Sequence, residues 1–181
     1  PFLTLHHWDL PQALFELGGW LNRDLGCDFA DYAALMVKRL GDRVRHWATF
    51  NEPGVIAFDG YLSGEHAPGE QDIVKARQVA HNLMVAHGLA VQAMRAIHPD
   101  LQLGIVLSQW NAEPLDDDPA SIANAELAWY ANETTFLHPI FRGYYHPDQV
   151  AAAAESMPKF QPGDMALIAQ KLDFLGINSY S

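Results

Sequence analysis

The sequence contains very little cysteine and few basic residues. Cys27 is the single cysteine among 181 residues, which excludes an internal disulfide framework and a cysteine-rich metal site. Lys and Arg together number 11 against 22 Asp and Glu, which gives a formal charge of −11. So acidic a chain is poorly suited to binding nucleic acid or an anionic membrane surface. We therefore expect a small, neutral partner.

Several kinds of segment are also missing. The sequence has no run of about 18 apolar residues, which predicts no membrane span, and nothing in it resembles a cleaved signal peptide. We favour a cytoplasmic location on this basis, although the native N-terminus is expected to lie upstream of Pro1. No strand is followed by a glycine-rich phosphate turn of the GxGxxG type. His81 and His87 lack HxxxH spacing, so we expect structural histidines, no metal and no cofactor.

Four short apolar runs, rich in β-branched and aromatic residues, have the length of buried strands. They cover residues 2–7, 46–51, 102–107 and 174–178. Because these runs hardly alternate between apolar and polar residues, they are typical of a parallel sheet with helices outside it. The helices predicted between them cover residues 29–40, 72–97 and 118–131, with shorter ones near 139–141, 149–154 and 164–171. This alternation indicates a single α/β domain.

Polar residues follow every predicted strand at the same end. The four groups are His6-His7-Trp8-Asp9, Asn51-Glu52-Pro53, Ser108-Gln109-Trp110-Asn111 and Asn178-Ser179-Tyr180. In a barrel of parallel strands the carboxyl ends converge on one mouth, where residues from several strands build a common site. Carboxyl, amide and imidazole groups beside aromatic rings suit a neutral ligand with many hydroxyl groups. The pattern therefore indicates a site for a carbohydrate.

Glu52 is the pivotal residue of this pattern. A carboxyl group in a partly desolvated cleft can protonate a leaving oxygen, which is the chemistry that cleavage of a glycosidic bond requires. From spacing alone, an ordinary salt-bridged or exposed glutamate is an equally good interpretation.

Five linked segments carry a more specific signal. They are TLHHWDLP at residues 4–11, LGDRV at 40–44, WATFNEP at 47–53, GEHAPG at 64–69 and DFLGIN at 173–178. In this order they resemble glycoside hydrolase family 1, the β-glucosidase family, over nearly the whole chain. The resemblance implies a (β/α)8 barrel and a retaining hydrolase of β-linked glycosides. Residues 1–181 are then expected to form one partial domain, covering about strands three to six of the barrel, with both ends truncated.

The resemblance also implies roles for individual residues. Glu52 matches the general acid/base of the family at the end of the fourth strand. Asn51 matches the neighbouring amide that binds the 2-hydroxyl of the sugar. His7 and Trp8 match the pair after the third strand that lines the pocket for the glycone.

Further matches and departures concern the rest of the mouth. Asn178 and Tyr180 match the pair after the sixth strand, whose tyrosine in the family contacts the nucleophilic carboxylate. His66 matches a position that lines the aglycone side. Gly54 stands where the family often has Trp, so the usual platform for the aglycone is absent, and Ser179 stands where the family often has Tyr. Both departures leave the aglycone preference open.

A retaining glycosidase needs a second carboxyl group, about 5–5.5 Å from the first. The family supplies this nucleophile from a Thr-Glu-Asn-Gly type of segment on the seventh strand, and the present sequence contains none. We therefore expect the nucleophile to lie outside the chain and the isolated 181-residue polypeptide to be inactive. Two other functions stay open. The chain could belong to a non-catalytic carbohydrate-binding relative, or it could be a half-barrel that acts only with a complementary chain.

Overall fold

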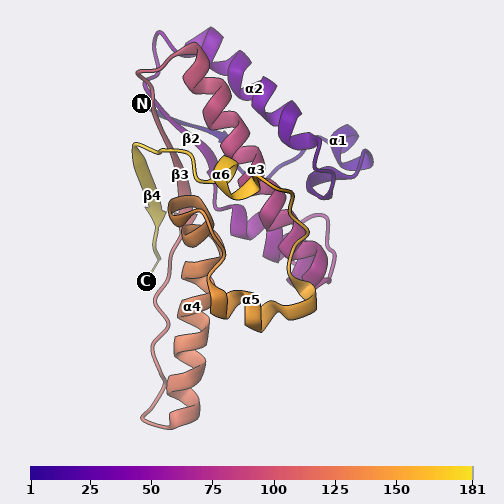
Figure 1. Ribbon diagram of the computed structural model, residues 1–181, viewed down its shortest axis with the longest axis vertical. Coiled ribbons are helices and arrows are strands. Elements are labelled where there is room, and N and C mark those ends of the chain that lie inside the picture. The colour runs from indigo at the N-terminus through magenta and orange to yellow at the C-terminus, as the bar shows by residue number, and fades with distance from the viewer. Residues whose placement is uncertain (181) are drawn as a thin grey trace.

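Four parallel strands with helices between them make up the fold (Figure 1). The computed structural model describes residues 1–180, apart from the side chains of residues 129–133. In chain order the elements are β1 (Phe2–His6), α1 (Gln12–Glu16), the 3₁₀-helix η1 (Gly19–Leu21), α2 (Leu25–Leu40), β2 (His46–Asn51), the π-helix η2 (Val55–Ser63), α3 (Ile73–Ile97), β3 (Gln102–Ser108), α4 (Pro119–Arg142), α5 (Pro147–Ala153), the 3₁₀-helix η3 (Ala154–Ser156), α6 (Asp164–Ile168) and β4 (Phe174–Asn178).

The strands pair in the order β1-β2-β3-β4, and every pairing is parallel. This confirms the sequence prediction of a parallel sheet, with strand bounds that differ from the predicted ones by one residue at most. Side chains of β2 and β3 are largely buried, with Trp47, Phe50 and Leu103 completely so. The near-continuous apolar composition of these strands therefore reflects burial on both faces of the central sheet.

The helix α2 packs beside α3, and together they cover one face of the sheet (Figure 1). It begins at Leu25, four residues before the predicted start, and buries Phe29 and Val37 on one stripe. Gly41 ends the helix in a right-handed conformation, with φ −65°. A Cβ atom at this position would lie 2.6 Å from the Val37 carbonyl oxygen and 2.9 Å from Cδ2 of His98. Close packing therefore requires glycine here.

The helix α3 spans almost the predicted range, and its first turn is capped by the Asp72 side chain. Because this carboxylate accepts two backbone N–H groups, it satisfies donors that the helix itself leaves unpaired. His81 and His87 are completely buried. Nδ1 of His87 lies 2.7 Å from the Thr49 hydroxyl oxygen, so this ring connects α3 to β2. Both histidines are structural residues, as the sequence predicts.

The predicted break between residues 118–131 and 139–141 is wrong, because α4 runs without interruption through Pro139. Proline removes one backbone donor from a helix, which normally bends or ends it. Here Phe136 and Ile140, one turn apart, are buried on either side of the proline. The helix is therefore anchored in the core on both sides of the proline.

The remaining differences from prediction concern short helices. The helix α5 begins two residues earlier than predicted, and α6 ends three residues earlier. The sequence analysis missed α1, η1 and η2, since none of them shows an apolar stripe long enough to identify. The first half of α4 and the connection before it extend beyond the carboxyl end of the sheet (Figure 1).

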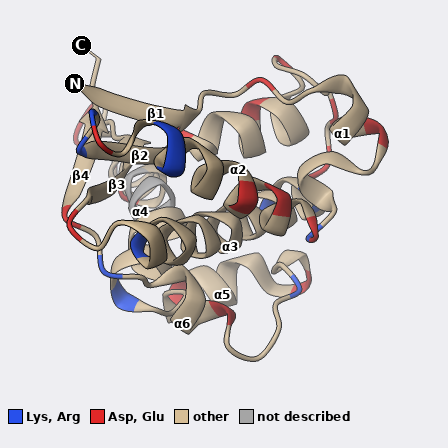
Figure 2. Cartoon of the chain, turned by 90° about the horizontal axis from the view of Figure 1, so that it is seen from above, with Lys and Arg blue, Asp and Glu red and all other residues tan. Residues whose placement is uncertain are grey.

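Acidic residues outnumber basic ones and lie on many different elements. Figure 2 shows the acidic positions scattered over the helices and the connecting loops. Cys27 is a free thiol, exposed on α2. Of the helices in residues 1–180, none combines the length and the apolar character needed to cross a bilayer.

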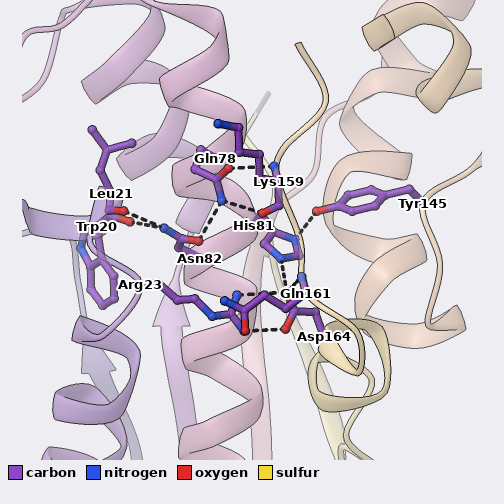
Figure 3. A network of polar contacts seen from close by, with 10 residues as sticks. All are labelled: Trp20, Leu21, Arg23, Gln78, His81, Asn82, Tyr145, Lys159, Gln161 and Asp164. Atoms are coloured by element: carbon purple, nitrogen blue, oxygen red, sulfur yellow. Dashed lines mark hydrogen bonds and ion pairs between the residues drawn. The ribbon is translucent and has the colours of Figure 1, made fainter. Parts of the chain in front are cut away.

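A cluster of polar residues around Asp164 joins the segment before α2 to α3 and α6 (Figure 3). Nη1 and Nη2 of Arg23 donate to the two Asp164 oxygens, at 3.0 and 2.5 Å. Nε2 of His81 lies 2.9 Å from Asp164 Oδ2, and its Nδ1 lies 2.7 Å from the Tyr145 hydroxyl. Burial lowers the pKa of His81, so the ring is neutral, donates to Asp164 and accepts from Tyr145. The backbone N–H of Gln161 supplies a further donor to Asp164 at 2.7 Å.

We expect Asp164→Asn to lower the free energy of unfolding by about 2 kcal/mol at pH 7, the order of a hydrogen bond to a charged group. Burial raises the pKa of Asp164, but hydrogen bonds from Arg23, Gln161 and His81 outweigh it and hold that pKa below its usual value. This contribution is therefore present above the pKa of an unfolded aspartate and is lost as the pH falls through the lower folded value. Urea denaturation of the variant beside Asp31→Asn, an exposed control, measures it. Equal midpoints for both variants would contradict the prediction.

Candidate active site

Residues from three strands meet at the carboxyl end of the sheet. His7 follows β1, Asn51 ends β2 with Glu52 directly after it, and Asn178 ends β4. The pairing of β2 with β3 shifts by one residue between Ala48 and Asn51, an irregularity of the kind that re-aims side chains beside active sites. The backbone N–H of Glu52 still donates to a carbonyl of β3, at 2.8 Å. The backbone of Glu52 is therefore fixed to the sheet.

The four side chains form a continuous chain of hydrogen bonds. Nδ2 of Asn178 donates to Oε1 of Glu52 at 2.7 Å and to Oδ1 of Asn51 at 3.1 Å. Nδ2 of Asn51 lies 3.2 Å from Nε2 of His7. Glu52 and Asn51 are 6% and 7% exposed, whereas His7 is exposed. The structure thus brings together four of the residues that the sequence analysis named, with the carboxyl group the most buried of them.

Two non-glycine residues at this mouth adopt left-handed backbone conformations. Trp8 has φ 78° and Glu52 has φ 46°, values that side chains other than glycine rarely adopt. The Trp8 ring lies between the rings of His7 and His66, with centroid distances of 5.0 and 5.4 Å. His66 therefore reaches the same mouth through Trp8. Tyr180 lies beyond the end of β4 and is 81% exposed, so it does not join the buried group.

A cavity of about 1120 Å³ opens next to Pro53, the residue after Glu52, between η2, the end of β3 and α4. Gly54, directly after that proline, and Trp110, after β3, are among the residues that line it. A Cβ atom at Gly54 would lie 3.4 Å from Cε2 of Phe136, so this ring from α4 packs against the glycine. The lining is mainly apolar, and its acidic residues are Asp59, Glu126 and Asp148.

Asp59 is a site residue that the sequence analysis missed. Burial raises the pKa of this carboxyl; His66 lowers it, and Glu65 and Glu52 raise it further. Asp59 lies on η2, a π-helix whose spacing the sequence does not reveal, and it is close enough to Glu52 for that carboxyl to affect its pKa. Among the side chains that the structure describes, those of residues 1–128 and 134–180, no group of three or more His, Cys, Asp or Glu residues could hold a metal ion.

Comparison with known proteins identifies the family of the chain. The model of glycosyl hydrolase family 1 matches residues 1–181. A 1,4-beta-D-glucan glucohydrolase of Thermotoga neapolitana is 43% identical over an alignment that covers all of this chain and 43% of that protein. Beta-glucosidase A of Thermotoga maritima is 41% identical, again over the whole chain and 41% of its own length. The chain thus spans about two fifths of the curated relatives it matches.

Solved structures give the same result. A psychrophilic beta-glucosidase from Micrococcus antarcticus superposes with a TM-score of 0.95 at 41% identity, covering 99% of this chain and 39% of that one. The beta-glucosidase of Thermotoga maritima in complex with deoxynojirimycin gives a TM-score of 0.93 at 41% identity, covering 100% and 41%. These neighbours confirm the predicted fold class, of which the four parallel strands are a part. With the family model matched from the first residue to the last, the chain belongs to glycosyl hydrolase family 1.

Proposed function

We propose that the complete protein containing this chain hydrolyses terminal β-linked glucosides with retention of anomeric configuration, and that Glu52 is its general acid/base. The observation that carries the proposal is the Glu52 carboxyl, 6% exposed at a strand end and hydrogen-bonded to Asn178 at 2.7 Å. Shielding from water and a fixed orientation are what a proton donor to a leaving group requires. The names of the relatives, which are glucosidases and a glucohydrolase, support the choice of glucosides.

The proposed reaction has two steps. A glutamate outside this chain attacks the anomeric carbon, the glycosidic bond breaks, and the proton of Glu52 passes to the departing oxygen. The product of this step is an ester between the sugar and that glutamate. Glu52 then removes a proton from water, which attacks the same carbon and breaks the ester bond. One carboxyl group therefore acts first as an acid and then as a base.

The proposed sugar site uses the side chains around Glu52. Asn51 would hold the 2-hydroxyl, next to the bond that breaks, and His7 and Trp8 would line the glycone pocket with one polar and one aromatic group. Asn178 would keep Glu52 in place, and Tyr180 would meet the nucleophile supplied from outside the chain. The neutral character of these groups suits a sugar, which carries no charge. On the aglycone side, we assign His66 to the wall of the site.

The test compares the complete protein with the 181-residue chain on an aryl β-glucoside, following the released phenol and the anomer formed first by NMR. We expect the complete protein to release the β-anomer and the isolated chain to release no phenol, because retention needs two carboxyl groups. If the isolated chain releases phenol and its Glu52→Gln variant does not, the proposal that the second carboxyl group lies outside the chain is refuted. A complete protein that binds the glucoside without cleaving it would favour the non-catalytic alternative.

A further inference from the structure

The hydrogen bonds from Glu52 to His7 fix the orientation of every amide between them. Nδ2 of Asn178 carries two hydrogens, and both are used, by Glu52 Oε1 and Asn51 Oδ1. The amide of Asn51 therefore presents its own NH₂ group to Nε2 of His7, at 3.2 Å. Because an NH₂ group cannot accept, Nε2 of His7 must carry a lone pair, and the proton of the neutral ring sits on Nδ1. We call this four-residue chain of hydrogen bonds the amide relay.

A second arrangement of the amide relay has both amides turned over. His7 then donates from Nε2 to Oδ1 of Asn51, and Asn51 donates from Nδ2 to Oδ1 of Asn178. That carbonyl oxygen also faces Glu52, where it needs a donor, and only a protonated carboxyl group can donate. Turning one amide alone is unfavourable, because it places two NH₂ groups or two carbonyl oxygens face to face.

We propose that Asn51 and Asn178 couple the proton on Glu52 to the hydrogen-bonding state of His7. An ionised Glu52 allows only the first arrangement, so it holds His7 neutral with its lone pair on Nε2. A His7 ring that donates from Nε2 requires the second arrangement and therefore a protonated Glu52. The protonated carboxyl is compatible with both arrangements, since it has an O–H donor and a carbonyl acceptor.

This inference rests on the proposed function, in which Glu52 gains and loses a proton in each cycle. Asn178 is then a positioning residue that offers a hydrogen bond to Glu52 in either state, as a donor to the carboxylate and as an acceptor from the acid. A fixed donor such as a lysine would favour the carboxylate alone. The two amides therefore do not disfavour the protonated form of Glu52, which the first step of the reaction needs.

The coupling has the opposite sign to the one that simple electrostatics predicts. A carboxylate near an imidazole ordinarily favours the protonated ring. Other charges around the two groups are His6 and Asp9 beside His7, and Asp59, Glu65 and His66 on η2 and the loop after it. Burial lowers the pKa of His6 to about 4, so that ring is neutral at neutral pH. The amide relay predicts that removing the charge of Glu52 lets His7 donate a hydrogen bond from Nε2.

The experiment is ¹⁵N NMR of the complete protein with labelled histidine, because ring nitrogen shifts distinguish a donor from an acceptor. The His7 signals are assigned with His7→Gln. Above neutral pH we expect His7 to carry its proton on Nδ1. In Glu52→Gln, which conserves shape, we expect the population protonated on Nε2 to rise about tenfold, the factor for losing one hydrogen bond to a charged group.

Two further variants isolate the relay. Asn178→Leu keeps the charge of Glu52 but breaks the relay, so it should release His7 in the same way. Glu65→Gln removes a nearby charge outside the relay and should leave the His7 ring as it is. A His7 ring with its proton on Nε2 in the parent would overturn the inference, and so would a ring whose tautomer is unchanged in Glu52→Gln. Because this readout does not need turnover, loss of the proposed hydrolysis would leave it intact.

Discussion

Glu52→Gln in the complete protein is expected to lower kcat/KM for an alkyl β-glucoside by about 10²- to 10⁴-fold, the usual contribution of a general acid. Glutamine keeps the shape of the side chain and a partner for Asn178, but it has no proton to give to the departing oxygen. An alkoxide is a poor leaving group, so the first step is expected to slow by the full factor. Steady-state kinetics on the parent and the variant measure the loss.

The leaving group provides an internal control for this prediction. A nitrophenolate is stable without a proton, so its departure should slow far less in Glu52→Gln than the departure of an alkoxide. Glu65→Gln, which removes a carboxyl group from the following loop, should retain near-parental rates on both substrates. Equal losses on alkyl and nitrophenyl glucosides would mean that Glu52 does not protonate the leaving group.

Acidification from pH 7 to pH 4 is expected to cost the folded chain about 3 kcal/mol for each of two buried histidines. Burial lowers the pKa of His87 to about 4, and burial likewise lowers that of His6 to about 4 against the opposing effect of Asp9. Between an unfolded value near 6.5 and these folded values, the unfolded chain binds more protons than the folded one. Stability therefore begins to fall below about pH 6.5, and this loss is nearly complete near pH 4.

Urea denaturation at pH 7, 5 and 4 measures this loss. His87→Leu removes one of the two titrations at a completely buried position, so it should lower stability at pH 7 but flatten the pH dependence by about half. His66→Gln, at an exposed position, should leave the slope unchanged. A slope that His87→Leu does not alter would show that this ring is not held neutral by burial.

The strands and the polar groups after them could be predicted from sequence because both are local patterns. A buried strand such as β2 is apolar along its length, and the residues that follow it, Asn51 and Glu52, stand out by contrast. The family resemblance then gave these residues roles that spacing could not. The sequence analysis divided the helix α4 before Pro139 because a proline disfavours a helix locally. The packing of α4 against distant parts of the chain is not visible in the sequence.

Contacts between distant residues explain most of what the sequence analysis missed. Arg23 and Asp164 are 141 positions apart, and no periodicity relates them, yet their ion pair connects the outer helices. The hydrogen bond from Asn178 to Glu52 spans 126 positions. The sequence analysis could name each residue as a site residue, but it could not predict the hydrogen bond between them. Asp59 was missed for a local reason, because a π-helix changes the spacing at which residues share one side.

The left-handed backbone at Trp8 and Glu52 has an evolutionary consequence. A non-glycine residue held in this region costs on the order of 1–3 kcal/mol, and glycine would relieve most of that cost at either position. Glycine at Glu52 would also remove the carboxyl group, and glycine at Trp8 would remove the ring between two histidines. At Glu52, selection for a more stable fold alone would therefore favour loss of the carboxyl group that gives this mouth its chemistry, whereas the Trp8 ring also packs against the core, which opposes its loss. Any programme of thermostabilising this chain should hold both positions fixed.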